Sequence, residues 1–291
     1  MGGEVPKLLL VVKKLLYLII NSYHLIVLAY FSPCIRPHLD CHNFFQPQNS
    51  TYMRKLFLLL VVLPLFTLAQ DKTVVSVSRY FPKVDKVQQF EKALAAHAQK
   101  YHKGDQQWRV FSIESGPDAG GYQVVEGPAT WDAHDKRGDL GKAHMDDWSA
   151  SVQSLLTEKG SSSFSTFRKD LSTVQLNEYS DKIAINHLFY KPGYYGEMQE
   201  SIVKMKKVWE QSNQAIAVYE ASSSGEPQFV IVTRYKQGLK ERETGFLEIL
   251  PVRYTKTHGQ EGWNKHVAGL KEMISHQWGE MLFYKPELGS K

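Results

Sequence analysis

Two patterns of apolar and polar residues begin shortly after residue 70. From Val75 to Phe81, alternate positions form one face of an extended segment, and this period of two predicts a β-strand. Downstream, apolar residues recur in steps of three and four, the spacing that places side chains on one face of an α-helix. That stripe consists of Val87, Phe90, Leu94, His97 and Tyr101. The pattern therefore predicts a strand followed by an amphipathic helix.

The same strand and helix recur 108 positions later. The face that begins at Val75 is repeated by Ile183, Ile185, His187 and Phe189. The helical stripe is repeated, with identical steps, by Tyr195, Met198, Ile202, Met205 and Trp209. Self-similarity at a constant offset indicates a duplicated structural unit. The sequence therefore predicts two copies of one repeat.

The rest of each copy follows at similar offsets. The strand segment "GYQVVEG" matches "PQFVIVTRY", with Tyr122 opposite Phe229 at offset 107. A second helix matches at offset 115, where Trp148 corresponds to Trp263. A final strand, "SFSTFRKDL", matches "EMLFYKPEL" at offset 117. Offsets that hold within elements and change in loops are expected for a duplication with loop insertions.

Each half has the order β-α-β-β-α-β, which is the ferredoxin-like order. We assign the first repeat to residues 70–176, a linker to 177–182 and the second repeat to 183–291. A ferredoxin-like sheet carries helices on one face, so its other face needs a cover. Two copies can cover each other, sheet to sheet. The sequence therefore predicts an α+β protein whose two repeats form one intramolecular barrel around a cavity. Such a chain is a monomeric pseudo-dimer, and further homodimerisation stays open.

Residues 53–69 have the three zones of a secretory signal peptide. Met53 is followed by Arg54 and Lys55, then by an apolar run over 56–66, then by small residues up to Ala69. The run is shorter than the roughly 20 residues that span a bilayer. Cleavage near Ala69 would leave an exported chain, periplasmic or extracellular, with no stable membrane anchor in its mature form.

Residues 1–52 have two interpretations. They contain either a transmembrane anchor over 15–31 or translated upstream sequence before a true start at Met53. We favour the second interpretation, in which residues 1–52 are a non-native or disordered extension, because a complete signal peptide has no reason to follow an anchor. Both cysteines, Cys34 and Cys41, fall here, and their spacing matches no standard zinc pattern. We therefore predict no metal site from these cysteines.

Charge and motifs exclude several classes of function. Positions 71–291 carry 29 basic and 28 acidic residues, so the basic character of the whole chain belongs to its leader and no nucleic-acid partner is expected. The sequence contains no phosphate-binding glycine loop, no Gly-x-Ser-x-Gly elbow and no His-Glu-x-x-His helix. The chemistry must therefore be sought in the predicted cavity.

Strand parity predicts which side chains face this cavity. His97 and His187 share faces with apolar residues, and we assign both to packing. The side chains on the opposite face of each strand are smaller and more polar, as a ligand pocket requires. Its members are Ser76, Ser78 and Tyr80 in the first repeat and Ala184, Asn186 and Leu188 in the second. Trp148, His258 and Trp263, at the second helix of each repeat, complete the candidate ligand pocket.

Two segments of the first half carry a family resemblance. They are "VVSVSRYFPKVDKVQQFEKAL" and "YQVVEGPATWDAHDKRGDLGKAHMDDWSASVQSLL", in which a strand runs into a Trp-x-x-His stretch at 131–134 and a His-led helix follows at 144–148. In the order of these elements and motifs, the chain resembles the dimeric α+β barrel superfamily. Its first half is most similar to the antibiotic-biosynthesis-monooxygenase branch. The resemblance covers residues 74–170 well and residues 183–285 thinly.

The resemblance implies a fold and two alternative sites. The superfamily includes cofactor-independent oxygenases of aromatic polyketides, haem-degrading enzymes and proteins without known activity. A haem site would use His144 or His258 as the iron ligand beside Asn186. A metal-free site would use Asn186, Trp131 and His134 as a base, holding an aromatic substrate whose enolate reacts with oxygen. The plainer interpretation is that these histidines are exposed and the tryptophans pack.

These observations predict an exported protein that binds a small apolar or aromatic molecule between its two repeats. This first prediction requires no cofactor. The alternative is an oxidoreductase, either a cofactor-independent monooxygenase or a haem-binding or haem-degrading enzyme. Its catalytic candidates are His144, Asn186, Trp131 and His134.

Overall fold

The computed structural model describes residues 71–138, 140–221 and 224–291. The predicted extension 1–52, the signal peptide 53–69 and the cleavage site near Ala69 lie outside the described residues. Within the described ranges, no helix combines the length and the apolar character needed to cross a membrane.

The first repeat contains four strands and three helices in the order β-α-β-β-α-α-β. The elements are β1 (Val74–Pro82), α3 (Val87–Tyr101), β2 (Trp108–Ser115), β3 (Tyr122–Ala129), α4 (Trp131–Arg137), α5 (Lys142–Asp147) and β4 (Leu156–Phe167). Helix α4 begins where the Thr130 side chain accepts a hydrogen bond from the Ala133 amide, as a helix N-cap does. Helix α5 continues directly into a π-helical turn, Trp148–Val152.

The second repeat has the same order with one long helix in place of two short ones. Its elements are β5 (Lys182–Tyr190), α6 (Tyr195–Gln211), β6 (Ile216–Ala221), β7 (Gln228–Arg234), α7 (Leu250–Met273) and β8 (Ile274–Tyr284). Strands β1 and β5 begin 108 residues apart, as do β2 and β6. Helix α7 is interrupted at Gly259, whose φ of 76° lies in the left-handed region that glycine tolerates.

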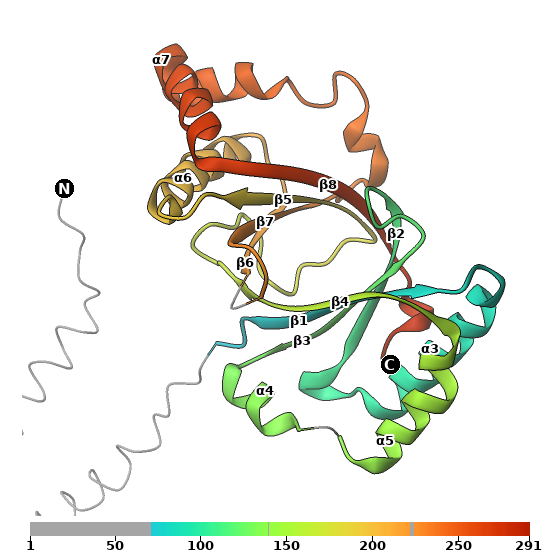
Figure 1. The fold of residues 1–291 in the computed structure, drawn as a ribbon. Helices are drawn as coiled ribbons and strands as arrows, with labels where there is room; N and C mark the ends of the chain where they lie inside the picture. The colour runs from blue at the N-terminus through green and yellow to red at the C-terminus, as the bar shows by residue number, and fades with distance from the viewer. Residues whose placement is uncertain (1–70, 139, 222–223) are drawn as a thin grey trace, which may run out of the picture. The chain divides into compact units, whose positions relative to one another are not determined.

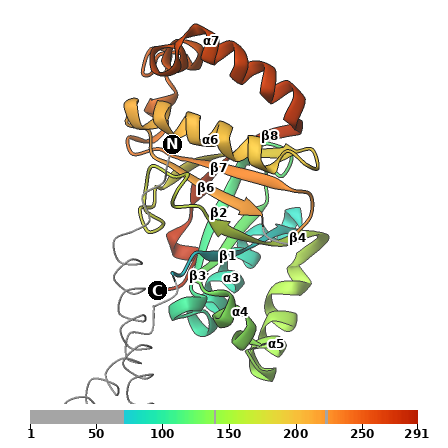
Figure 2. The ribbon, with the colours of Figure 1, turned by 90° about the vertical axis from the view of Figure 1, so that its left-hand side faces the viewer.

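The eight strands form one closed antiparallel barrel in the order β1-β3-β2-β8-β5-β7-β6-β4. Each repeat contributes a four-stranded sheet, and the two sheets join where β2 pairs with β8 and where β4 pairs with β6. Figure 1 and Figure 2 show α3, α4 and α5 on one side of the barrel and α6 and α7 on the opposite side. The predicted fold class is confirmed: two ferredoxin-like repeats form a dimeric α+β barrel within one chain.

The apolar residues form three cores. One lies inside the barrel and contains Phe111, Ile183 and Leu282. The other two lie outside it, where α3 packs on the first sheet through Phe90 and Leu94, and α6 packs on the second sheet. Each sheet is therefore buried on both faces, by helices outside and by the other sheet inside.

The predicted strand parity was wrong. Val75, Val77 and Arg79 point into the barrel, as do Ile183, Ile185 and His187, whereas Ser76, Ser78 and Tyr80 lie on the outer face. The prediction assumed that the more apolar face meets the helices. In a closed barrel the inner face is covered equally well by the opposite sheet, so it carries the valines and isoleucines.

A buried ion pair links the two repeats inside the barrel. Both terminal nitrogens of Arg79 on β1 donate to the Glu280 carboxylate on β8. Arg79 also donates to Asp118 Oδ2 at 2.6 Å and to Gln123 Oε1 at 3.0 Å. The Glu280 side chain is fully buried, and Arg79 is 7% exposed. The pair therefore crosses the junction that closes the barrel.

We predict that Glu280→Gln lowers the free energy of unfolding by about 3 kcal/mol, because it leaves the Arg79 charge buried without its main partner. The measurement is urea denaturation at neutral pH, followed by circular dichroism. Glu261→Gln is the control, since Glu261 pairs with Lys265 at the surface of α7 and its loss is expected to cost less than about 1 kcal/mol. Equal losses for the two variants would contradict the assigned role of the buried pair.

Candidate functional site

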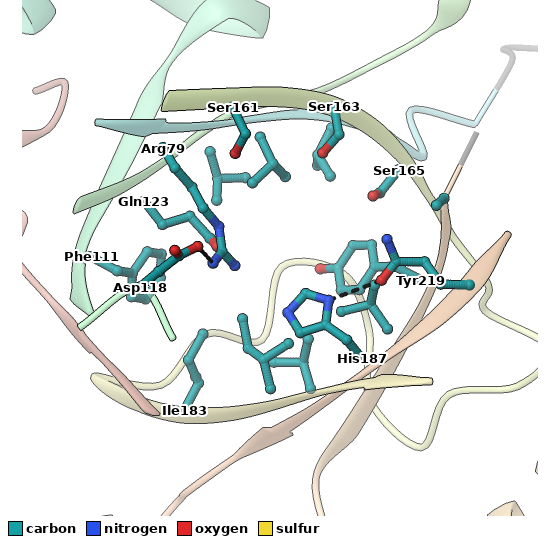
Figure 3. Close-up of a pocket in the computed structure, with 18 of the residues that line it drawn as sticks. Arg79, Phe111, Asp118, Gln123, Ser161, Ser163, Ser165, Ile183, His187 and Tyr219 are labelled. Carbon is teal, nitrogen blue, oxygen red and sulfur yellow. Dashed lines mark hydrogen bonds and ion pairs between the residues drawn. The ribbon is translucent and has the colours of Figure 1, made fainter. Parts of the chain in front are cut away.

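The barrel encloses a cavity of about 350 Å³ that is lined by both repeats. Figure 3 shows side chains from opposite sides of the barrel pointing into it, including Arg79 and Gln123 from the first repeat and Ile183 and His187 from the second. A volume of this size lies at the lower end of the range for small-molecule sites. The barrel interior therefore contains a pocket beside its apolar core.

The walls of this cavity are mainly apolar. The apolar wall consists of Val75, Val77, Phe111, Val125, Ile183, Ile185, Val230 and Val232. Ser161, Ser163 and Ser165 add a row of hydroxyl groups along β4, because alternate residues of a strand face the same way. Such a surface suits a ligand with an apolar body and few polar groups.

One part of the wall carries a connected polar cluster. His187 Nε2 lies 3.0 Å from Glu280 Oε1, and His187 Nδ1 lies 2.9 Å from Gln228 Oε1. The His187 ring stacks on Trp278 with 3.9 Å between centroids. Glu280 also accepts the bonds from Arg79 described above. Both ring nitrogens of His187 are thus engaged by protein side chains, which fixes the ring and leaves neither nitrogen pointing at an empty space.

Another part of the wall holds two arginines and a tyrosine. Arg109 donates to the Gly127 carbonyl at 2.8 Å, and its guanidinium carbon lies 4.0 Å from the centre of the Tyr179 ring. Arg234 donates to backbone carbonyls at the end of the first repeat, including that of Gln175 at 2.9 Å, and to the Tyr219 hydroxyl at 3.1 Å. Among the described residues, no carboxylate lies within ion-pair distance of either arginine. This part of the cavity therefore carries uncompensated positive charge.

A second pocket, of about 290 Å³, lies on the outer face of the first sheet. Ser76, Ser78, Tyr80 and His134 line it, so four residues that the sequence assigned to the site share a pocket outside the barrel. Burial raises the pKa of the Tyr80 hydroxyl. The His134 Nε2 atom is buried and has no hydrogen-bond partner among the described residues.

Glu126 is the charged centre of this second pocket. Burial alone would raise the pKa of its carboxyl, but hydrogen bonds from His102 and Trp108, together with the Arg137 charge, outweigh burial and lower that pKa to about 2. Trp108 Nε1 donates to Glu126 Oε2 at 2.8 Å, and Arg137 Nε lies 2.7 Å from Glu126 Oε1. The carboxylate therefore remains ionised and holds three neighbouring side chains in place.

The structure does not bring the catalytic candidates together. Trp131 and His134 lie near each other on α4, and both rings contact Phe164. Asn186 is exposed on the outer face of β5 beside Gly279. His144 is buried elsewhere, against His97 and His102. A site that needs Asn186 beside either of the other groups is therefore not formed.

The remaining pocket candidates lie outside the barrel cavity. Trp148 packs against Tyr80 and His97, and Leu188 packs in the outer core of the second repeat. Trp263 and His258 lie beside Tyr254 of α7. These residues lie outside because the strand face that the sequence assigned to the cavity is the outer face of the sheets, where the helices pack.

Neither proposed iron ligand is placed to hold haem. The His258 Nε2 atom donates to the Lys204 carbonyl at 2.9 Å. The His144 Nε2 atom lies 3.4 Å from His102 Nε2, so it faces another imidazole and not an open pocket. An axial ligand needs a ring nitrogen directed at the space that the porphyrin fills. These two histidines do not meet that requirement in this structure.

The sequence contained a signal for the residues that were missed. Arg79 and His187 stand at equivalent positions of the two repeats, 108 residues apart, each on an otherwise apolar strand face. A polar residue at the same place in both copies marks the inner wall of the barrel. Glu280 and Asp118 gave no such signal, because their partnership with Arg79 depends on barrel closure.

No family model matches the chain, and no curated protein matches it. Among solved structures, the chain is similar to a provisionally named monooxygenase from Lactobacillus acidophilus NCFM, with 9% identity, a TM-score of 0.47 and coverage of 76% of this chain and 97% of that one. It is also similar to an anthrone oxidase-like protein (10% identity, TM-score 0.46, coverage 75% and 93%). A third similar structure is the chlorite dismutase of Candidatus Nitrospira defluvii, with 8% identity, a TM-score of 0.43 and coverage of 76% of this chain and 94% of that one.

The activities named for these three proteins are theirs. The assignment to the dimeric α+β barrel fold rests on the closed strand order and the duplicated elements of the chain itself.

We predict that Glu126→Gln lowers the free energy of unfolding by about 3 kcal/mol at pH 7, the equivalent of the pKa shift from 4.5 to about 2. The folded-state pKa is the lower one, so this stabilisation is present above pH 4.5 and is lost as the pH falls towards 2. Urea denaturation of both proteins across this range tests the prediction. Glu158→Gln, on an exposed part of β4, is the control. A difference in the free energy of unfolding between wild type and Glu126→Gln that does not shrink at low pH would contradict the prediction.

Proposed function

We propose that this protein binds a small organic acid with an apolar or aromatic body inside the barrel cavity. The observation that carries the proposal is the combination of an apolar cavity of about 350 Å³ with two guanidinium groups that have no carboxylate partner among the described residues. The apolar wall provides the burial, and the guanidinium groups provide the recognition of charge.

The distribution of charge favours an acid over a neutral ligand. Arg79 is compensated by Glu280 and Asp118, and Asp118 also pairs with Lys159. Arg109 and Arg234 contact carbonyl oxygens and aromatic rings instead. A guanidinium shielded from water gains more from a carboxylate than from a carbonyl, because hydrogen bonds between charged groups are stronger. A ligand carboxylate would supply the negative charge that no described side chain of the protein supplies to Arg109 and Arg234.

The geometry of the cavity favours binding over turnover. The polar groups able to act on a substrate, His187 and Glu280, are engaged with each other and with Arg79 and Gln228. A general base must reach the proton that it removes. The same groups, held rigidly, are well suited to orienting a bound molecule.

Affinity for a matched pair of ligands tests the proposal. We expect 2-naphthoate to bind with one site per chain in isothermal titration calorimetry, and the neutral 2-naphthamide to bind more weakly. Arg109→Gln should weaken naphthoate binding by roughly 10- to 100-fold, the equivalent of one charge-assisted hydrogen bond. Lys271→Gln, an exposed cation on α7, should leave binding unchanged. Equal binding of the acid and the amide would contradict the selectivity for acids.

A variant that fills the cavity tests the location independently. Ser163→Phe places a ring in the space between the sheets and should abolish naphthoate binding while the circular dichroism spectrum is retained. Ser275→Phe, at an exposed position of β8, is the matched control. Unchanged binding by Ser163→Phe would exclude the barrel as the site. Oxygen uptake during incubation with naphthoate would indicate an enzyme instead of a binding protein.

We also propose that the protein acts outside the cytoplasm after removal of residues 53–69. Strand β1 begins at Val74, so cleavage after Ala69 would leave every strand of the barrel intact. We expect the chain recovered from an exporting bacterial host to begin at Gln70, as read by N-terminal sequencing or intact mass. A retained Met53 would contradict signal cleavage, and a retained Met1 would show that residues 1–52 are translated.

A further inference from the structure

Three histidines of the first repeat meet in a buried cluster outside both pockets. His97 belongs to α3, His102 follows that helix directly, and His144 belongs to α5. Their exposed fractions are 1%, 0% and 8%. Ring centroids are separated by 4.8 Å for His97 and His144, and by 5.3 Å for each of the other two pairs. The three rings therefore form a compact triangle inside the protein.

One ring nitrogen from each histidine faces the middle of this triangle. Potential ligand atoms of the three side chains all lie within 4.8 Å of one another. The Nε2 atoms of His102 and His144 are 3.4 Å apart. The Nε2 atom of His97 is buried with no hydrogen-bond partner among the described residues. A proton shared between His102 and His144 leaves the Nε2 atom of His97 unsatisfied.

Carboxylates lie beside the outer nitrogens of two rings. His97 Nδ1 is hydrogen-bonded to Asp147 Oδ2 at 2.8 Å, and His102 Nδ1 lies 3.2 Å from Glu126 Oε2. The hydrogen bond to Asp147 places the proton of His97 on Nδ1 and leaves Nε2 as its metal-binding nitrogen. Carboxylate, imidazole and metal in this order are the usual arrangement around protein-bound zinc, in which the carboxylate fixes the tautomer and the orientation of the ring.

The fold itself does not require histidines here. At the 108-residue offset that relates the repeats, His97 corresponds to Met205 and His102 to Glu210. Helix α6 packs on its sheet through Met198, Ile202 and Trp209 without an equivalent cluster. A buried imidazole nitrogen without a hydrogen-bond partner destabilises the folded state, because it has lost its contact with water and gained none in return. The first repeat therefore carries a cost that apolar packing avoids in the second.

We propose that His97, His102 and His144 bind one divalent transition-metal ion, with zinc as the best match to three neutral imidazoles. The ion satisfies all three inward nitrogens at once. Tetrahedral zinc with bonds of roughly 2.1 Å separates its ligand nitrogens by roughly 3.4 Å, so the longest separation contracts on binding. Because the ligands come from both α3 and α5, the ion fastens the short helix α5 to the rest of the repeat.

The test uses the full chain purified without a histidine tag, stripped with EDTA and exchanged into metal-free buffer. We expect it to take up one Zn²⁺ per chain, measured by titration calorimetry and elemental analysis, with a rise in the melting temperature. Co²⁺ should give the intense visible absorption of a tetrahedral site. His144→Ala should weaken Zn²⁺ binding by more than roughly 100-fold, and Asp147→Asn, which alters the residue that orients His97, by roughly 10- to 100-fold.

Two further measurements keep the outcome decisive. His276→Ala, which removes an exposed histidine of the second repeat, should bind Zn²⁺ as wild type does. If His144→Ala does not fold, the Co²⁺ spectrum and the EDTA-dependent melting temperature of wild type decide the matter. Wild type that takes up no Zn²⁺, or that binds it no more tightly than a folded His144→Ala variant, would overturn the proposal and leave the cluster as aromatic packing.

Discussion

The structure depends on one constraint: each four-stranded sheet has helices on one face and must bury the other. A single repeat would expose its inner valines and isoleucines to water, at roughly 25 cal/mol for each Å² of apolar surface. The two sheets bury these faces against each other and close through two short antiparallel junctions, β2 with β8 and β4 with β6. Closure also leaves no unpaired strand edge in the barrel. The cavity is the space that these two faces leave between them.

Joining the two repeats in one chain allows each to carry different chemistry. In a barrel made from two identical chains, a residue on the inner wall would appear twice. Here the equivalent positions hold Arg79 and His187, and Glu280 of the second repeat bonds to both. The outer surfaces differ in the same way, since His97 of the first repeat corresponds to Met205 of the second. The duplication thus preserves the scaffold while the two halves carry different side chains at equivalent positions.

Much of the scaffold could be predicted from the sequence, and less of the site. The periods of two and of three to four identified strands and helices because these patterns are local, and their recurrence at offsets of 107 to 117 indicated two repeats. Strand parity was misjudged because the opposite sheet covers the inner faces of β1 and β5, so the more apolar face of a strand need not be the one that meets the helices. The contact of Arg79 with Glu280 joins residues 201 positions apart and exists only after closure. The pairing of Trp131 with His134 was visible from their spacing, whereas the distance of Asn186 from both was not.

If the barrel interior is a ligand site and not a packing defect, the protein should carry a bound molecule when it is isolated. Native mass spectrometry of the exported chain, isolated without added ligand, is the measurement that decides between the two. We expect a chain that retains a small acid in a one-to-one complex, and a Ser163→Phe variant that has lost the adduct. A bare chain that also fails to retain added 2-naphthoate would contradict it, as would an adduct that Ser163→Phe leaves in place.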